Sequence, residues 1–143
     1  MKQKLIGIDY GTKRIGLAVS SPLGTVHPRP RRDRVTETTD LAFIAGLADE
    51  EGVSGIVIGL PHHMDGAQSE MEVAARKFAV KLAELSGLPV FGTDERLTSQ
   101  AADSILAGQH KNPRARKQRV DSAAACLLLQ DYLNAEQSGE RIA

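Results

Sequence analysis

An entirely apolar run, SGIVIGLP at residues 54–61, constrains the fold more than any other feature of the chain. A strand with one face toward water alternates apolar and polar residues, whereas a strand covered on both faces is apolar throughout. The closing proline prevents the run from continuing as a central strand. The run therefore predicts a buried strand in an α/β sheet that has helices on both faces.

Predicted strands and helices alternate around that run. Strands are predicted at 4–9, 14–20, 54–61 and 88–96, with a weaker extended stretch at 24–28. Helices are predicted at 36–51, 68–86, 98–107 and 120–136, and the first three are each followed by a glycine. The segment 111–119 is expected to be a loop. This order predicts one α/β domain over 1–136, with a five-stranded mixed sheet and a frayed tail at 137–143.

Composition and length agree with a single domain. The chain has 143 residues, of which 41% are apolar, and no apolar run approaches the ~20 residues that a membrane span needs. The N-terminus, MKQKLIGIDYG, turns directly into a strand that holds an acid and lacks the apolar core of a signal peptide. Cys126 is the single cysteine and lies in the apolar run AAACLLL, which favours a buried, reduced thiol. These features predict a cytoplasmic protein.

The charges are balanced overall but clustered locally. Lys plus Arg and Asp plus Glu both total 18, yet RPRRDR at 29–34 and KNPRARKQR at 111–119 hold half of the basic residues. Such clusters favour an anionic polymer or a phosphate-rich ligand, although basic loops can also simply be solvated. Aromatic residues make up only 3% of the chain, which argues against a base-stacking platform.

Acidic residues follow several of the predicted elements. Asp9 comes late in the first strand, Asp94-Glu95-Arg96 ends the strand at 88–96, and Asp121 opens the last helix. The carboxyl ends of parallel strands share one edge of a sheet, and acids gathered there suit divalent cations. Each acid also has a structural interpretation: Asp9 as an Asx-turn residue, the 94–96 stretch as a solvated turn, and Asp121 as a helix cap.

Four ordered motifs resemble the YqgF/RuvX family, which has a ribonuclease H-like fold. They are GIDYGTKRIGLAVS, VIGLPHHMDG, DERLTS and VDSAAACLLLQDYL, and they extend from about residue 4 to residue 134. The family is described as Holliday junction resolvases and as nucleases that mature the 5′ end of the small-subunit ribosomal RNA precursor. The resemblance implies a catalytic, metal-binding triad of Asp9, Glu95 and Asp121 that holds one or two Mg²⁺ or Mn²⁺ ions.

The resemblance predicts a metal-dependent nuclease that acts on structured RNA or branched DNA. In a ribonuclease H-like sheet Asp9 and Glu95 lie two strand spacings apart, ~9–10 Å between backbones, which a metal pair can bridge. Alternation in the second strand places Gly16, Ala18 and Ser20 on one face, and the nucleic acid has room to approach if Asp9 shares that face. The basic residues expected to contact phosphates are Lys13, Arg14, Arg96, Lys111, Arg114, Arg116, Lys117 and Arg119. Two-fold cleavage of a junction would require a homodimer.

Two other classes of protein remain open from the residues alone. The first motif also resembles the phosphate-binding segment of the actin, sugar-kinase and chaperone ATPases, but those proteins close two related domains on a nucleotide. A non-catalytic nucleic-acid-binding module would explain the basic clusters and leave the acids unexplained. His62 and His63 lie in a variable part of their motif and are assigned no role.

Overall fold

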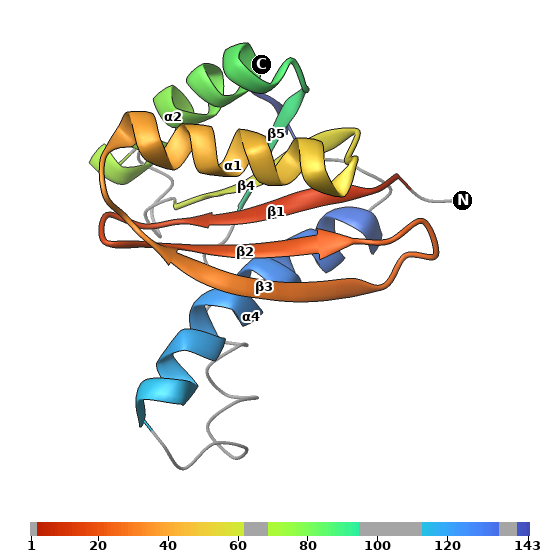
Figure 1. The fold of residues 1–143 in the computed structure, drawn as a ribbon, viewed down its shortest axis with the longest axis vertical. Coiled ribbons are helices and arrows are strands. Elements are labelled where there is room, and N and C mark those ends of the chain that lie inside the picture. Colours follow the sequence, from red (N-terminus) through yellow and green to blue (C-terminus); the bar gives the residue numbers. More distant parts are fainter. Residues whose placement is uncertain (1–2, 62–68, 95–112, 135–139) are drawn as a thin grey trace.

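Six strands form one mixed sheet in the order β3-β2-β1-β4-β5-β6 (Figure 1). The computed structural model describes residues 3–61, 69–94, 113–134 and 140–143, with the backbone alone described for 94, 113–122 and 140. The strands are β1 (Leu5–Tyr10), β2 (Arg14–Ser20), β3 (Val26–Asp33), β4 (Gly55–Leu60), β5 (Val90–Asp94) and β6 (Glu140–Arg141). The helices are α1 (Glu37–Glu51), α2 (Glu70–Ser86) and α4 (Pro113–Asn134). The predicted α/β class is confirmed, with one strand more than expected.

The direction of the strands changes along the sheet as predicted. β1, β2 and β3 form an antiparallel meander, whereas β4 and β5 run parallel to β1. β3 is longer than the extended stretch predicted at 24–28 and includes most of the basic segment 29–34. Pro28 and Pro30 have no backbone N–H to donate to a second neighbouring strand. β3 accordingly lies at an edge of the sheet.

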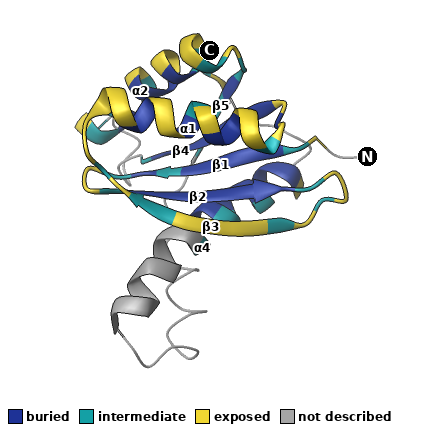
Figure 2. Ribbon diagram, in the orientation of Figure 1, coloured by how far each residue is buried: buried dark blue, intermediate teal, exposed yellow. Residues whose placement is uncertain are grey.

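Alternating side chains divide the core between the two faces of the sheet. Ile6, Ile8 and Leu17 pack with α1 and α2 on one face, whereas Leu5 and Val57 pack with α4 on the other. Figure 2 shows the buried central strands between these helices, with the outer strand β3 largely exposed. Every residue of β4 is buried, because helices cover both of its faces. Among the helices that the structure describes, none has the length and apolarity to cross a membrane.

The first two helices end where the sequence predicts and begin within two residues of the predicted positions. Thr36 caps α1 and forms a capping box with Thr39, and Ser69 caps α2 by accepting a hydrogen bond from the Glu72 N–H. Gly52 and Gly87 follow the two helices with φ of 66° and 74°, the left-handed conformation that glycine adopts without strain.

The C-terminal residues form an edge strand, so the prediction of a frayed tail is wrong for residues 140–143. β6 pairs antiparallel with β5, and the Val90 N–H donates to the Ala143 carbonyl at 2.9 Å. Ile142 packs against the apolar core, and its Cδ1 lies 3.0 Å from where a Cβ on Gly92 would be. Burial of Ile142 and the unpaired edge of β5 both favour this strand, although the segment is too short to show a periodic pattern.

The last helix begins earlier than predicted. α4 starts at Pro113, so the segment expected to be a loop over 111–119 is helical from 113 onward. Proline is favoured in the first turn of a helix, and Arg, Lys, Gln and Ala are strong helix formers. The high charge of this segment favoured the prediction of a loop, whereas the intrinsic helix propensity of its residues favours the helix that forms.

Asp121 consequently lies inside α4, so the interpretation of this residue as an N-terminal cap is wrong. The helix expected at 98–107 lies outside the described residues.

Candidate active site

Asp9 lies on the face of the sheet that α4 covers. In the β1–β2 ladder Asp9 pairs with Gly16 and Gly7 pairs with Ala18, and residues that pair directly share a face. Ala18 and Leu5 belong to the cluster packed under α4, whereas Ile8 and Tyr10 face α1 and α2. The predicted condition that Asp9 shares the side of Gly16, Ala18 and Ser20 is therefore confirmed.

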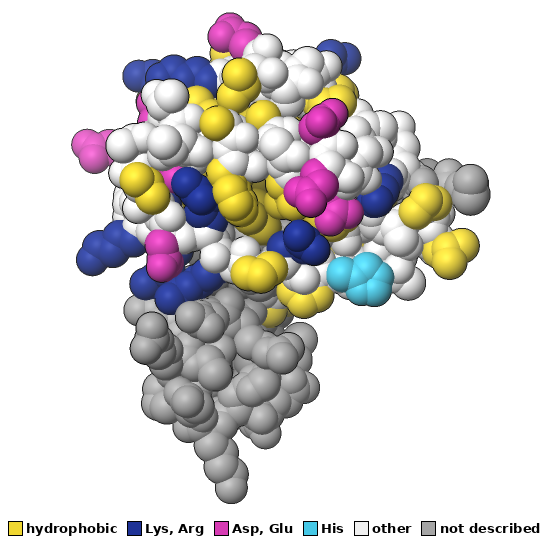
Figure 3. Space-filling model, in the orientation of Figure 1, with side chains coloured by type: hydrophobic (Ala, Val, Ile, Leu, Met, Phe, Trp, Pro, Cys, Tyr) yellow, Lys and Arg dark blue, Asp and Glu magenta, His cyan; other side chains and the backbone are white. Residues whose placement is uncertain are grey.

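A hollow of about 220 Å³ brings Asp9 together with the β1–β2 turn. Its lining includes Asp9, Gly16, Lys13 and Arg14, so one acid and two of the predicted phosphate-contacting residues meet there. The turn is tight, because a Cβ on Gly11 would lie only 2.4 Å from the Arg14 carbonyl oxygen. Figure 3 shows several Lys and Arg side chains at the end of the sheet where this turn lies. The hollow combines carboxylate oxygen with flanking positive charge.

α4 crosses β1 closely enough to place Asp121 at the same end of the sheet as Asp9. A Cβ on Gly7 would lie 2.9 Å from Leu129 Cβ and 3.0 Å from the Ala125 carbonyl oxygen, so only glycine admits the helix at this point. Figure 1 shows α4 running against the direction of β1. Asp9 follows Gly7 by two residues, and Asp121 precedes Ala125 by one helical turn, so both backbones continue toward the same end.

The parallel register brings the end of β5 to the same edge. Ile8 pairs with Ile58, which pairs with Gly92, so β5 is two strands away from β1, as expected. Asp94 is the last residue of β5 and pairs with Leu60. The predicted residues Glu95, Arg96 and Lys111, as well as His62 and His63, lie outside the described residues.

Asp9 is the one member of the predicted triad whose side chain the structure describes. Asp121 and the basic residues Arg114, Arg116, Lys117 and Arg119 are described by backbone alone. Over the described side chains no group of three or more His, Cys, Asp and Glu could hold a metal ion. The carboxylate of Asp9 is a hard oxygen donor of the kind that Mg²⁺ and Mn²⁺ bind, so its chemistry fits the predicted metal.

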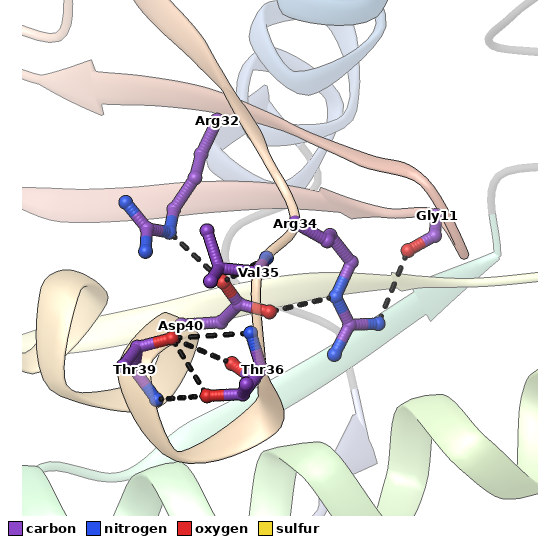
Figure 4. A network of polar contacts seen from close by, with 7 residues as sticks. All are labelled: Gly11, Arg32, Arg34, Val35, Thr36, Thr39 and Asp40. Carbon is purple, nitrogen blue, oxygen red and sulfur yellow. Dashed lines mark hydrogen bonds and ion pairs between the residues drawn. The ribbon is translucent and has the colours of Figure 1, made fainter.

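Asp40 is a buried charge that the sequence prediction did not single out. Its carboxylate accepts hydrogen bonds from Arg32 Nε at 3.0 Å, Arg34 Nε at 3.0 Å and the Val35 N–H at 3.1 Å (Figure 4). Burial alone would raise the pKa of Asp40, but the bonds from Arg34, Val35 and Arg32 hold that pKa below its usual value. The sequence could have indicated that Asp40 is buried, because it precedes Ile44 by four residues and so lies on the apolar face of α1.

Cys126 is half-buried in α4, where burial raises the pKa of its thiol to about 11. The thiolate is the nucleophilic form of cysteine, and it is scarce at neutral pH at such a pKa. The sequence predicts a buried, reduced thiol, and the structure shows that Cys126 is only partly buried.

The strand order and the acid at the end of β1 define a ribonuclease H-like protein. Thermus thermophilus RuvC, solved in complex with a Holliday junction substrate, matches with a TM-score of 0.65 at 14% identity, covering 98% of this chain and 99% of that one. The large terminase nuclease of the thermophilic phage G20c matches with a TM-score of 0.55 at 13% identity, covering 92% and 81%. At these identities the likeness establishes the fold.

Sequence comparison establishes the family. Residues 3–135 match the RuvX family, which is described as Holliday junction resolvase. Curated relatives named "Putative pre-16S rRNA nuclease" include proteins of Brucella anthropi, 41% identical over 99% of this chain and 86% of theirs, and of Moorella thermoacetica, 40% identical over 92% and 94%. The chain therefore belongs to the RuvX family and is a nuclease, a hydrolytic enzyme. The family match decides for a nuclease over the ATPase and the non-catalytic module.

Proposed function

We propose that this chain cleaves structured nucleic acid with divalent metal held by Asp9, Glu95 and Asp121. The observation that carries this proposal is the position of Asp9, on the α4 face of the sheet and in a hollow beside Lys13 and Arg14. When bound, Mg²⁺ or Mn²⁺ supplies an activated water and stabilises charge at the scissile phosphate. The strand order supports Glu95, which follows directly after β5, and the helix direction supports Asp121.

The chain's own residues orient the substrate around that centre. Lys13 and Arg14 extend from the turn beside Asp9 and are proposed to neutralise the phosphates that flank the cleaved bond. Arg96, Lys111, Arg114, Arg116, Lys117 and Arg119 are proposed to contact phosphates farther along the backbone. Gly16 has no side chain, and Asp9 is its direct partner across the ladder, so the nucleic-acid backbone has access to the carboxylate.

The substrate we favour is the precursor of the small-subunit ribosomal RNA, cleaved near its 5′ end. Relatives that carry the pre-16S rRNA nuclease name match this chain at about 40% identity over nearly all of its length. The second candidate is a Holliday junction, which the family description favours. A junction has two-fold symmetry and would require a homodimer, which sedimentation of the protein with and without a four-way junction would detect.

A cleavage assay with Mn²⁺ tests both candidates side by side. Structured RNA that contains the 5′ precursor segment, single-stranded RNA and DNA, and a four-way DNA junction are offered to the parent and to Asp9→Asn. Cleavage of the structured RNA by the parent alone supports the RNA assignment, and symmetric cleavage of the junction supports the DNA assignment. Equal cleavage by the parent and by Asp9→Asn would contradict the proposed site.

A further inference from the structure

We propose that Arg34 and Asp40 are positioning residues that hold the β1–β2 turn, and with it Lys13, in place beside Asp9. This inference rests on the proposed function, in which Lys13 contacts a phosphate next to the cleaved bond. Arg34 and Asp40 belong to the β3–α1 connection and to α1, on the opposite face of the sheet from α4.

Asp40 provides a fixed anchor. Its side chain is only 1% exposed, and both carboxylate oxygens accept hydrogen bonds. Burial of an ionised carboxylate is costly unless it is fully paired, and a buried ion pair is often no more stabilising than apolar residues of the same size. The start of α1 does not require this charge, because Thr36 and Thr39 already cap the helix. The presence of a buried carboxylate at position 40 is therefore better explained by its role in orienting Arg32 and Arg34.

Arg34 connects that anchor to both ends of the turn. Its Nε donates to Asp40 at 3.0 Å and its Nη1 donates to the Gly11 carbonyl at 3.2 Å (Figure 4). Its backbone N–H donates to the Lys13 carbonyl at 2.9 Å. The guanidinium also lies 4.9 Å from the ring centroid of Tyr10, the last residue of β1. Arg34 thus holds the carbonyl before Thr12 through its side chain and the carbonyl after Thr12 through its backbone N–H.

The turn held in this way separates two hollows. Thr12 and Lys13 line the hollow that contains Asp9, and they also line a second hollow of about 470 Å³ that contains Arg34 and Asp40. If Arg34 no longer holds the Gly11 carbonyl, the turn gains freedom to move toward the second hollow, and Lys13 moves away from Asp9. Misplacement of a contact by about 1 Å can cost up to 100-fold in rate.

Arg32 is a matched control for Arg34. It also donates to Asp40 at 3.0 Å, and its side chain is 18% exposed, against 15% for Arg34. The Arg32 guanidinium lies 4.2 Å from the ring centroid of Phe43 on α1, and among the described residues its side chain makes no hydrogen bond to the β1–β2 turn. Replacement of either arginine by lysine keeps the charge and removes the planar fork, so both variants lose comparable structural contacts.

The test compares Arg34→Lys, Arg32→Lys and Lys13→Ala in the full chain by nucleic-acid binding in EDTA at several salt concentrations. We expect Arg34→Lys and Lys13→Ala each to lower the log–log salt slope by ~0.7–0.9, the value of one lost phosphate contact, and Arg32→Lys to leave the slope unchanged. The double variant Lys13→Ala/Arg34→Lys should lose no more than Lys13→Ala. With Mn²⁺, Arg34→Lys should reduce kcat/KM by about 10- to 100-fold at an unchanged fold.

Two results would overturn the inference. One is an equal loss of slope or rate in Arg32→Lys and Arg34→Lys at matched melting temperatures, which indicates a structural role alone. The other is an additive loss in the double variant, which means that Arg34 acts independently of Lys13. The proposed function fails separately, if the parent does not cleave or if Asp9→Asn cleaves like the parent. Loss of cleavage in Asp9→Asn with normal behaviour of Arg34→Lys contradicts the inference alone.

Discussion

Asp9 of β1 lies directly opposite Gly16 of β2, so the carboxylate has a neighbour without a side chain on the face that α4 covers. In the same ladder, Ile8 pairs with Leu17 on the face packed against α1 and α2. One residue of register decides between these faces, because successive side chains in a strand point to opposite sides. Asp9 reaches the face that α4 covers because it falls on an odd-numbered position of β1.

Asp9→Asn should abolish metal-dependent cleavage and leave the fold and most of the nucleic-acid affinity intact. The substitution keeps the size of the side chain and removes the negative charge that is proposed to bind the metal. Cleavage rates with Mn²⁺, melting temperature and binding in EDTA measure the three properties. A folded variant that cleaves at the parent rate, in a preparation free of other nucleases, would show that Asp9 is not a ligand.

Gly7→Ala should destabilise the protein by about 1–3 kcal/mol, because the new Cβ meets Leu129 Cβ at 2.9 Å and the Ala125 carbonyl oxygen at 3.0 Å. Gly46→Ala is the matched control. Position 46 lies within α1, where a Cβ meets nothing within 4 Å, so the change should stabilise by about 0.5–1 kcal/mol. Urea unfolding measures both. If Gly7→Ala leaves the stability unchanged, α4 does not approach β1 as closely as described. The argument that places Asp121 at the same end of the sheet as Asp9 then fails.

Asp40→Asn should destabilise the protein by about 3 kcal/mol near neutral pH, since two arginines lose their buried counter-charge. The pKa of Asp40 lies below its usual 3.8, so the ionised side chain stabilises the folded protein above that pH. That contribution is lost as pH falls through the lowered pKa. Unfolding free energies measured from pH 6 to pH 2 should therefore converge for parent and variant at the acid end. A constant difference would assign the loss to packing.

Mn²⁺ should stabilise the parent against thermal unfolding, and Glu95→Gln or Asp121→Asn should remove most of that gain. A ligand that binds only the folded state contributes about 2.7 kcal/mol at a hundredfold excess over its Kd. In EDTA each variant should be as stable as the parent, or more stable by about 1 kcal/mol at most, because crowded carboxylates repel one another. Asp121 lies inside α4, so the loss of a helix cap is not expected. A metal-induced shift that stays undiminished in both variants would place the metal elsewhere.

The basic residues of α4 should contribute unequally to binding. Positions 114, 117, 121 and 125 follow one another at three- and four-residue spacing, so Arg114 and Lys117 continue the stripe of Ala125, while positions 116 and 119 fall on the opposite side of the helix. Arg114→Ala/Lys117→Ala should lower the log–log salt slope by roughly 1.4–1.8, and Arg116→Ala/Arg119→Ala should lower it by a smaller amount. An unchanged slope in both double variants would mean that this helix does not contact phosphates.

Local patterns in the sequence determined most of the secondary structure and the position of Asp9. The uninterrupted apolar run at 54–61 indicated β4 because only a strand covered on both faces has that composition. Gly52 and Gly87 marked helix ends because a left-handed residue there favours glycine. The alternation in β2 predicted that Gly16, Ala18 and Ser20 share one face, since strand periodicity is a local property, and the β1–β2 register then placed Asp9 on that face.

Tertiary structure alone decided the features that depend on distant partners. The carboxylate of Asp40 is stable in the core because Arg32 and Arg34 reach it from the end of β3, and no pattern within α1 reveals them. The tail becomes β6 because the edge of β5 is available and Ile142 finds the core. Local periodicity reports which side of an element is apolar, whereas ion pairs and edge strands depend on which elements become neighbours, and only the folded chain specifies that.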